Sequence, residues 1–348
     1  MSPYVMAHLF LALGIATTVT FASSHWLLAW MGLEMNTLAI LPLMAQNHHP
    51  RAVEAATKYF LIQAAAAATL LFASITNAWL TGEWNIQQMS HPLSTTMIML
   101  ALALKIGLAP FHTWLPEVLQ GLSLGVGLIL STWQKLAPFA LIIQIQPTNS
   151  PLLIILGLMS IFIGGWGGLN QTQLRKILAY SSIAHLGWMI LVLQFSTSIT
   201  LIALTMYIIM TTAAFLTFII NNCTNINALA ASWSKAPFLT ALAPLILLSL
   251  GGLPPLTGFM PKWLILQELT KQDIALPAVL AALMALLSLY FYLRLTYALV
   301  MTIPPNNLPG TPPWRAPPTK FALPLAILVT MALCLLPMTP GIFTLFFP

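Results

Sequence analysis

Four ionisable side chains lie deep inside long apolar tracts of this sequence. They are one acid and three lysines: Glu34, Lys105, Lys135 and Lys262. A charge at the centre of a bilayer costs roughly 2.5–3.5 kcal/mol, so each of these groups must face other protein, pair, or touch water. Burial brings the pKa values of carboxyl and amino groups toward neutrality, where both exchange protons readily. The four residues therefore predict a proton-transfer series inside a membrane.

Each of the four also has a structural explanation. A lysine can extend its ammonium group to the membrane interface, which suits Lys262 better than Lys105 or Lys135 because these two lie far from either end of their tracts. Glu34 could be a protonated packing residue. Lysine suits proton transfer better than arginine does, since arginine stays charged.

Histidine and hydroxyl side chains extend the predicted series as candidate relays. His112 follows the helix-breaking Pro110 by two residues, and His185 lies within another apolar tract. Histidine exchanges protons near neutral pH, although a histidine on a packed helix is equally well a satisfied core residue. Hydroxyl groups hold water chains, but they commonly bond their own helix backbone. The hydroxyl candidates are Thr132, Ser181, Ser182 and Thr257.

Other charged residues and the cysteines carry weaker signals. Arg294 lies deep in an apolar tract and either pairs with an acid on a neighbouring subunit or reaches the interface. Glu117 and Lys176 lie near ends of apolar tracts, where they either guide protons or are simply solvated. Cys223 and Cys334 are far apart and belong to no metal-binding or iron–sulfur spacing, so both are expected to be packing residues.

The composition requires membrane-spanning elements to position these groups. The chain has 348 residues, of which 59% are hydrophobic and 5% charged, too few charges to cover a soluble surface. Apolar tracts of about 18–25 residues predict an all-α polytopic membrane protein with about eleven spans. The net charge of +6 is scattered singly, which excludes a nucleic-acid surface. The predicted spans are about 4–21, 25–45, 57–80, 94–120, 124–145, 151–169, 175–194, 197–221, 237–269, 275–302 and 321–346.

Two of these spans contain helix breakers in their middle. Pro110 interrupts the fourth span, and a cluster of glycine and proline interrupts the ninth. Broken backbone inside a membrane is tolerated where it is buried in protein or lines a polar cavity, as in transport paths. The breaks are five spans apart, which predicts two inverted five-helix repeats followed by one extra helix. The breaker cluster is Gly251, Gly252, Pro254, Pro255 and Gly258.

Loop charges predict the orientation. Basic residues concentrate in the loops on the side of the N-terminus, so that side is expected to face the cytoplasm-like compartment and the C-terminus the opposite one. The first tract lacks a basic leader and a cleavage site, so it is expected to remain as a transmembrane helix. The proline-rich segment 303–320 is expected to be an extended surface loop.

Three segments resemble motifs of the antiporter-like subunits of respiratory complex I. Residues 105–117 (K-x4-PFH-x-WLPE) resemble the first broken helix of that family. Residues 175–187 (RKILAYSSIAHLG) resemble a second motif, and residues 251–263 (GGLPP-x-x-GF-x3-W) resemble the second break. The resemblance covers nearly the whole chain. It departs from the family's fourteen-helix fold in lacking three helices at the start.

The resemblance implies a proton-pumping subunit of the mitochondrial inner membrane without a cofactor of its own. NADH, FMN, iron–sulfur clusters and ubiquinone would be bound by other subunits, and structural phospholipid could bind here. Glu34 and Lys105 would form a coupling pair, with Lys135 as central relay and Lys262 as terminal site. The N-terminus would face the matrix and the C-terminus the intermembrane space.

The same resemblance implies partners and a domain division. The partners would be neighbouring antiporter-like and small membrane subunits, together with supernumerary subunits. Residues 1–22 would form the first helix, residues 23–290 the antiporter-like domain, and residues 291–348 a C-terminal region. Two other functions remain open: a stand-alone cation/proton antiporter, and a membrane scaffold whose buried charges pair only for structural reasons.

Overall fold

The computed structural model describes residues 2–46, 49–145, 150–234, 237–301, 322–339, 341 and 344. Seven helices in this part of the chain are long and apolar enough to cross a membrane, and three shorter apolar helices accompany them. The β-type pairing in the described residues consists of two isolated bridges, His25 with Asn85 and Gln173 with Asn225. The prediction of an all-α polytopic membrane protein is therefore confirmed, while the number of about eleven spans stays a prediction.

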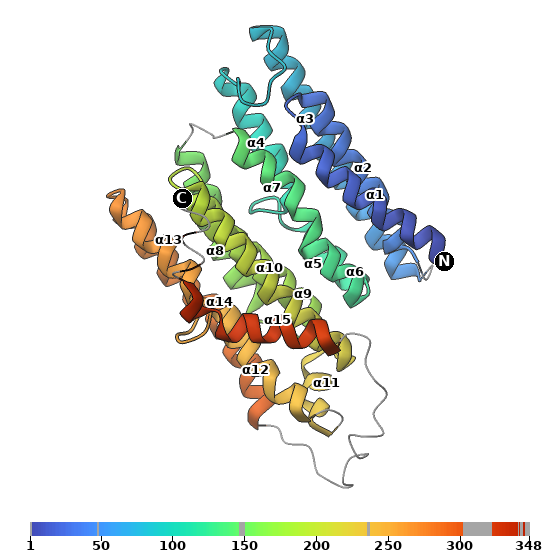
Figure 1. Cartoon of the computed structure of the whole chain (residues 1–348), viewed down its shortest axis with the longest axis vertical. Coiled ribbons are helices and arrows are strands. Elements are labelled where there is room, and N and C mark those ends of the chain that lie inside the picture. Colours follow the sequence, from blue (N-terminus) through green and yellow to red (C-terminus); the bar gives the residue numbers. More distant parts are fainter. Residues whose placement is uncertain are drawn as a thin grey trace. The chain divides into compact units, whose positions relative to one another are not determined.

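The chain divides into two compact units, Met1–Leu156 and Gly157–Pro348. In the first unit, the longest helix, α3, packs against α2, α4 and α5, and α7 packs against α1, α2 and α4 (Figure 1). The helices of this unit are α1 (Pro3–Ala22), α2 (Trp26–Met44), α3 (Pro50–Thr81), α4 (Pro92–Ile106), α5 (Trp114–Gly121), α6 (Leu124–Ser131) and α7 (Trp133–Ile145).

In the second unit, α10 packs against α9, α12, α13 and α15, and α14 packs against α9, α12 and α13. Glycines in α8 let α9 approach closely, because a side chain at Gly164 would lie 2.7 Å from the backbone nitrogen of Ala184. The helices are α8 (Ser150–Gly168), which begins in the first unit, and α9 (Leu174–Val192), α10 (Thr197–Ile220), α11 (Ile226–Ala230), α12 (Pro237–Gly251), α13 (Phe259–Lys271), α14 (Ala275–Met301) and α15 (Ala322–Cys334).

Both predicted helix breaks are confirmed. The fourth span consists of α4 and α5 with residues 107–113 between them, and the ninth consists of α12 and α13 with residues 252–258 between them. In each case the first half-helix is followed by a glycine in the left-handed conformation, which ends an α-helix without steric cost.

The structure alters three details of the predicted spans, of which only the start of the third span is a wrong boundary. The fifth span keeps its predicted bounds, Leu124–Ile145, but its helix is interrupted at Thr132, where the backbone has φ −114° and ψ −70°. The third span begins at Pro50 rather than 57, because proline suits the first turn of a helix even where charged residues dilute the apolar signal. The helix of the last span, α15, ends at Cys334 and is followed by a 3₁₀-helix, Leu336–Met338, while the end predicted at 346 lies outside the described residues.

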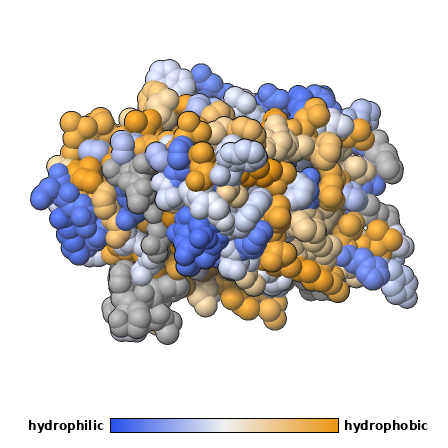
Figure 2. All heavy atoms as spheres, turned by 90° about the horizontal axis from the view of Figure 1, so that it is seen from above, coloured by the Kyte–Doolittle hydropathy of each residue, from blue (hydrophilic) through white to orange (hydrophobic). Residues whose placement is uncertain are grey.

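The surface fits a membrane environment. Large apolar side chains are exposed along α1 and α14, as expected for helices that face lipid or other subunits. Figure 2 shows one end of the molecule, where hydrophilic patches lie between hydrophobic ones. The predicted proline-rich loop 303–320 lies outside the described residues, and the inverted relation of the repeats stays a prediction.

Candidate functional site

The first helix break places Lys105 at the end of a half-helix. Gly107 adopts φ +85° and its N–H donates to the Ala103 carbonyl, which closes α4. Lys105 therefore lies in the last turn of α4, and its side chain is only 6% exposed. The C-terminal end of a helix carries about half a negative charge, which favours a nearby ammonium group. The break thus supplies partial compensation for a buried cation.

Lys105 and Lys135 line the same cavity. Lys135 lies in the first turn of α7, directly after the interruption at Thr132, and is 2% exposed. The cavity has a volume of about 20 Å³, which is room for about one water molecule. Both of its lysines are predicted members of the series, so the structure brings these two together. The other polar residues of the lining are Asn36, Thr37, Tyr59, Gln63 and Gln134.

Glu34 lies near Lys105 without contacting it. The two side chains are close enough to interact electrostatically, yet no ion pair within 4.0 Å joins them among the described residues. The Lys105 ammonium and the Oε2 atom of Glu34 are both buried, and neither has a hydrogen-bond partner in the described part of the chain. A direct Glu34–Lys105 pair is therefore not formed here, and the coupling of the two residues stays a prediction.

The second break holds Lys262 through a backbone carbonyl. Lys262 lies in the first turn of α13, and its Nζ donates to the carbonyl of Gly251, the last residue of α12, at 2.6 Å. Gly252 adopts φ +77°, and a Cβ there would lie 2.9 Å from this Nζ. Gly258 approaches so closely that a Cβ would lie 1.6 Å from the Ser249 carbonyl oxygen. The glycines of the predicted break are thus needed for contact with Lys262 and for close packing.

The candidate relay residues have partners both within their own segments and on other helices. Ser181 and Ser182 donate to carbonyls one turn back in α9, at 2.8 and 2.7 Å. Nδ1 of His112 lies 3.2 Å from the Pro110 carbonyl oxygen inside the first break. His185 lies against Tyr207 with ring centroids 5.7 Å apart. Their part in proton relay stays a prediction.

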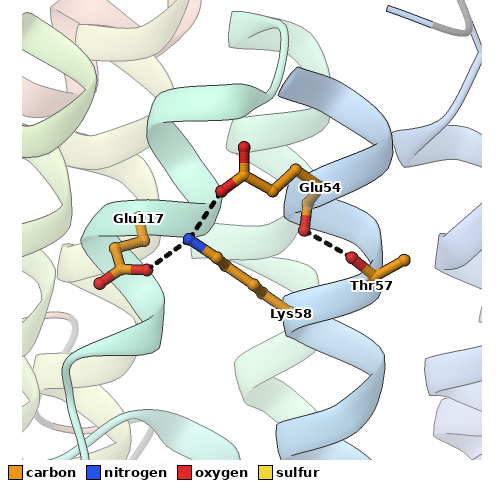
Figure 3. Close-up of polar contacts among 4 residues, drawn as sticks. All are labelled: Glu54, Thr57, Lys58 and Glu117. Atoms are coloured by element: carbon orange, nitrogen blue, oxygen red, sulfur yellow. Dashed lines mark hydrogen bonds and ion pairs between the residues drawn. The ribbon is translucent and has the colours of Figure 1, made fainter. Parts of the chain in front are cut away.

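Arg294 and Glu117 have partners that the sequence did not indicate. The Arg294 guanidinium is half-buried and donates to two backbone carbonyls, those of Leu169 and Gln171, just after the end of α8. Glu117 is exposed on α5 and accepts from Lys58 of α3 at 2.9 Å (Figure 3). Lys176 lies in the first turn of α9 and is half-buried.

Sequence reasoning missed several polar residues around the lysines. Nε2 of Gln63 donates to the Lys105 carbonyl at 3.2 Å, and Nε2 of Gln134 donates to Oδ1 of Asn36 at 3.2 Å. Both glutamines lie in apolar helices, as the four predicted residues do. An uncharged amide side chain in an apolar tract is the sequence feature that could have indicated these residues. It is a weaker indication of a buried polar site than a charged side chain is.

Comparison with known proteins agrees with the motif resemblance. The family model described as NADH:quinone oxidoreductase/Mrp antiporter, TM, matches residues 23–288, and that described as NADH dehydrogenase subunit 2 C-terminus matches residues 289–343. The chain is 72% identical to NADH-ubiquinone oxidoreductase chain 2 of Tetraodon nigroviridis over 99% of both chains. It is 69% identical to the protein of the same name from Oncorhynchus mykiss over 98% of both.

Solved structures share the fold. A chain of respiratory complex I from Thermus thermophilus is similar with a TM-score of 0.85 and 30% identity, over 96% of this chain and 78% of that one. A chain of the Mrp complex from Dietzia sp. is similar with a TM-score of 0.81 over 97% of this chain and 76% of that one. Its identity is 17%, so this second likeness concerns the fold alone.

Proposed function

We propose that this chain, which belongs to the NADH-ubiquinone oxidoreductase chain 2 family of antiporter-like complex I subunits, translocates protons across the mitochondrial inner membrane through buried Glu34, Lys105, Lys135 and Lys262. Electron transfer from NADH to ubiquinone takes place in other subunits and supplies the driving force. The observation that carries the proposal is the cavity shared by Lys105 and Lys135 beside a helix break.

The chemistry of the cavity supports proton transfer. Two lysines line a space large enough for about one water molecule, together with residues that carry amide and hydroxyl groups. Buried water with several polar partners connects groups that do not touch. Glu34 would act on Lys105 through its charge: a change in distance or protonation of this carboxylate changes the stability of the nearby ammonium.

The proposed path runs from Glu34 through Lys105 and Lys135 to Lys262. The N-terminus lies in the matrix and the C-terminus in the intermembrane space. Residues 1–22 form the first helix, residues 23–290 the proton-translocating domain, and residues 291–348 the C-terminal region. The partners are the other membrane subunits of complex I, supernumerary subunits and phospholipid, and the chain itself holds no redox centre.

Replacement of Lys105 by methionine in the assembled complex tests this function. Methionine is similar in length and keeps the apolar packing of the side chain, but it has no amino group that could bind or release a proton. We expect Lys105→Met to lower the number of protons translocated per electron, measured in proteoliposomes with a pH-sensitive dye. Lys271 is 61% exposed at its side chain, so Lys271→Met serves as the control. An unchanged ratio in Lys105→Met would refute the role assigned to this lysine.

The same assay separates the rival functions. If the buried charges were only structural, Lys135→Gln would impair assembly while the complexes that do form would pump normally. A stand-alone antiporter would exchange cations for protons in the absence of NADH and would purify without NADH-dehydrogenase subunits. Proton translocation that depends on NADH oxidation, and that is lost in Lys135→Gln, supports the proposed function against both.

A further inference from the structure

One face of α3 contacts both halves of the first broken helix. Its contact residues recur every three or four positions, so they lie on the same side of the helix. We call them the α3 contact face, and they are Arg51, Ala55, Lys58, Tyr59 and Gln63. None of them was predicted as a site residue.

The buried end of this face holds the last turn of α4. Nε2 of Gln63 donates to the Lys105 backbone carbonyl at 3.2 Å, and Gln63 is 3% exposed. This carbonyl is among the last four of α4, which have no partner within an α-helix. A buried carbonyl without a partner destabilises the fold, so Gln63 stabilises the end of the helix that carries Lys105.

The middle of the face holds the start of α5. The rings of Tyr59 and Trp114 meet edge to face with centroids 5.7 Å apart. Trp114 in turn donates from its indole nitrogen to the Leu104 carbonyl of α4 at 3.1 Å. Trp114 also lines the cavity of Lys105 and Lys135. A movement of α5 relative to α3 would therefore change the shape of that cavity.

The outer end of the face holds the end of α5 through a close approach of the backbones. A Cβ at Gly121 would lie 2.6 Å from the Arg51 carbonyl oxygen and 2.7 Å from the Cβ of Ala55. Both neighbours belong to rigid parts of α3, so neither can move aside as a flexible side chain would. Any residue larger than glycine must push α5 away from α3.

An ion pair joins the same two helices. The Lys58 ammonium lies 2.9 Å from Oε2 of Glu117 and 2.8 Å from Oε1 of Glu54 (Figure 3). Glu54 belongs to α3, one turn before Lys58, whereas Glu117 belongs to α5. The two carboxylates thus share one lysine, but only Glu117 links the helices.

We propose that the α3 contact face positions Lys105 for proton transfer by fixing α4 and α5 relative to each other. Gln63, Lys58 and Gly121 are positioning residues in this arrangement, since they act through Lys105 and do not exchange protons themselves. The inference rests on the proposed function of Lys105. It adds that the geometry of the break is set by the outer, exposed end of α3.

Two matched pairs of variants in the assembled complex test the inference. Gly121→Ala is compared with Gly125→Ala, because nothing lies within 4 Å of a Cβ at Gly125. Glu117→Gln is compared with Glu54→Gln, which removes the same charge from the same lysine without separating helices. The readouts are the rate of proton translocation per complex and its pH profile, and the pH profile is not altered by a loss of assembly alone.

We expect both variants that disturb α5 to affect proton translocation, while their controls leave it unchanged. Displacements near 1 Å cost up to about a hundredfold in rate, so we expect Gly121→Ala to lower the rate at least about tenfold and to shift its pH profile. An exposed ion pair contributes at most about a fivefold effect, which is the upper limit for Glu117→Gln. Glu117→Asp, which keeps the charge, should restore part of the loss.

Each outcome decides between the two proposals. If Lys105→Met abolishes pumping while Gly121→Ala and Glu117→Gln keep the normal rate and pH profile, the positioning inference is overturned and the function stands. If Glu54→Gln equals Glu117→Gln, surface charge explains the effect and the inference also fails. If Lys105→Met pumps normally, the proposed function itself fails.

Discussion

Replacement of Gly252 by alanine should displace Lys262 from the end of α12. Gly252 has φ +77°, and a Cβ there would lie 2.8 Å from Cδ and 2.9 Å from Nζ of Lys262. The left-handed backbone alone costs about 1–2 kcal/mol for a residue with a side chain. The new methyl group also collides with the lysine that donates to the Gly251 carbonyl, and a hydrogen bond from a charged group contributes about 1.5–3 kcal/mol.

Gly82 offers a control with the same backbone strain. It also has φ +77°, but nothing lies within 4 Å of a Cβ at that position. Gly82→Ala should therefore cost only the backbone part, and the difference between the two variants isolates the displacement of Lys262. If the hydrogen bond is lost completely, that difference of about 1.5–3 kcal/mol equals a factor of about 10–150 in the population of Lys262 bound at Gly251.

Proton translocation and heat inactivation of the purified complex measure these two effects. Both variants should inactivate at a lower temperature than the unaltered complex because both strain a left-handed turn. Only Gly252→Ala should also lose proton translocation at a temperature where the complex is intact. If Gly252→Ala and Gly82→Ala gave the same pumping rate, the contact between Lys262 and the end of α12 would not affect proton translocation. The expected role of this contact would then be refuted.

Three further substitutions test contacts between segments of the same unit. Arg294→Lys should lower the inactivation temperature, because one ammonium group replaces a planar guanidinium bonded to two carbonyls after α8; an unchanged temperature would contradict this. Thr257→Val should cost about 1 kcal/mol and speed hydrogen exchange in α15, since Thr257 donates to the Ala332 carbonyl at 2.5 Å; unchanged exchange would argue against it. Gln134→Leu should cost about 1–3 kcal/mol of stability by leaving Asn36 unpaired, and a neutral result in thermal unfolding would show that Asn36 finds another partner.

The helix breaks could be predicted from the sequence because their cause is local. Pro110 disfavours a helix, and the glycines at 251 and 252 end one without steric cost, so both breaks are marked in the sequence itself. The interruption at Thr132 has no such marker, since neither glycine nor proline stands at that position. Breaks marked by glycine and proline were therefore predicted, and this unmarked interruption was not.

The contacts of the site depend on tertiary structure and could not be predicted in the same way. Lys262 follows the break in sequence, yet its ammonium reaches back across it to Gly251. Gln63 is separated from Lys105 by more than forty positions and meets it only because α3 packs on α4. Apolar periodicity identifies which residues enter the membrane, but it does not say which helices become neighbours.

The two breaks share one electrostatic arrangement. Lys105 lies in the last turn of α4, and Lys262 donates to the last carbonyl of α12, so each lysine is associated with the C-terminal end of a half-helix. Such an end carries about half a negative charge, whereas a carboxylate partner carries a whole one. When a lysine paired with a carboxylate loses its proton, a buried anion remains, and that is costly. A half-helix end leaves only a dipole, so a lysine that exchanges its proton there, as the proposed function requires, would do so at a smaller change in free energy. Each of the two broken helices provides such an end beside a lysine.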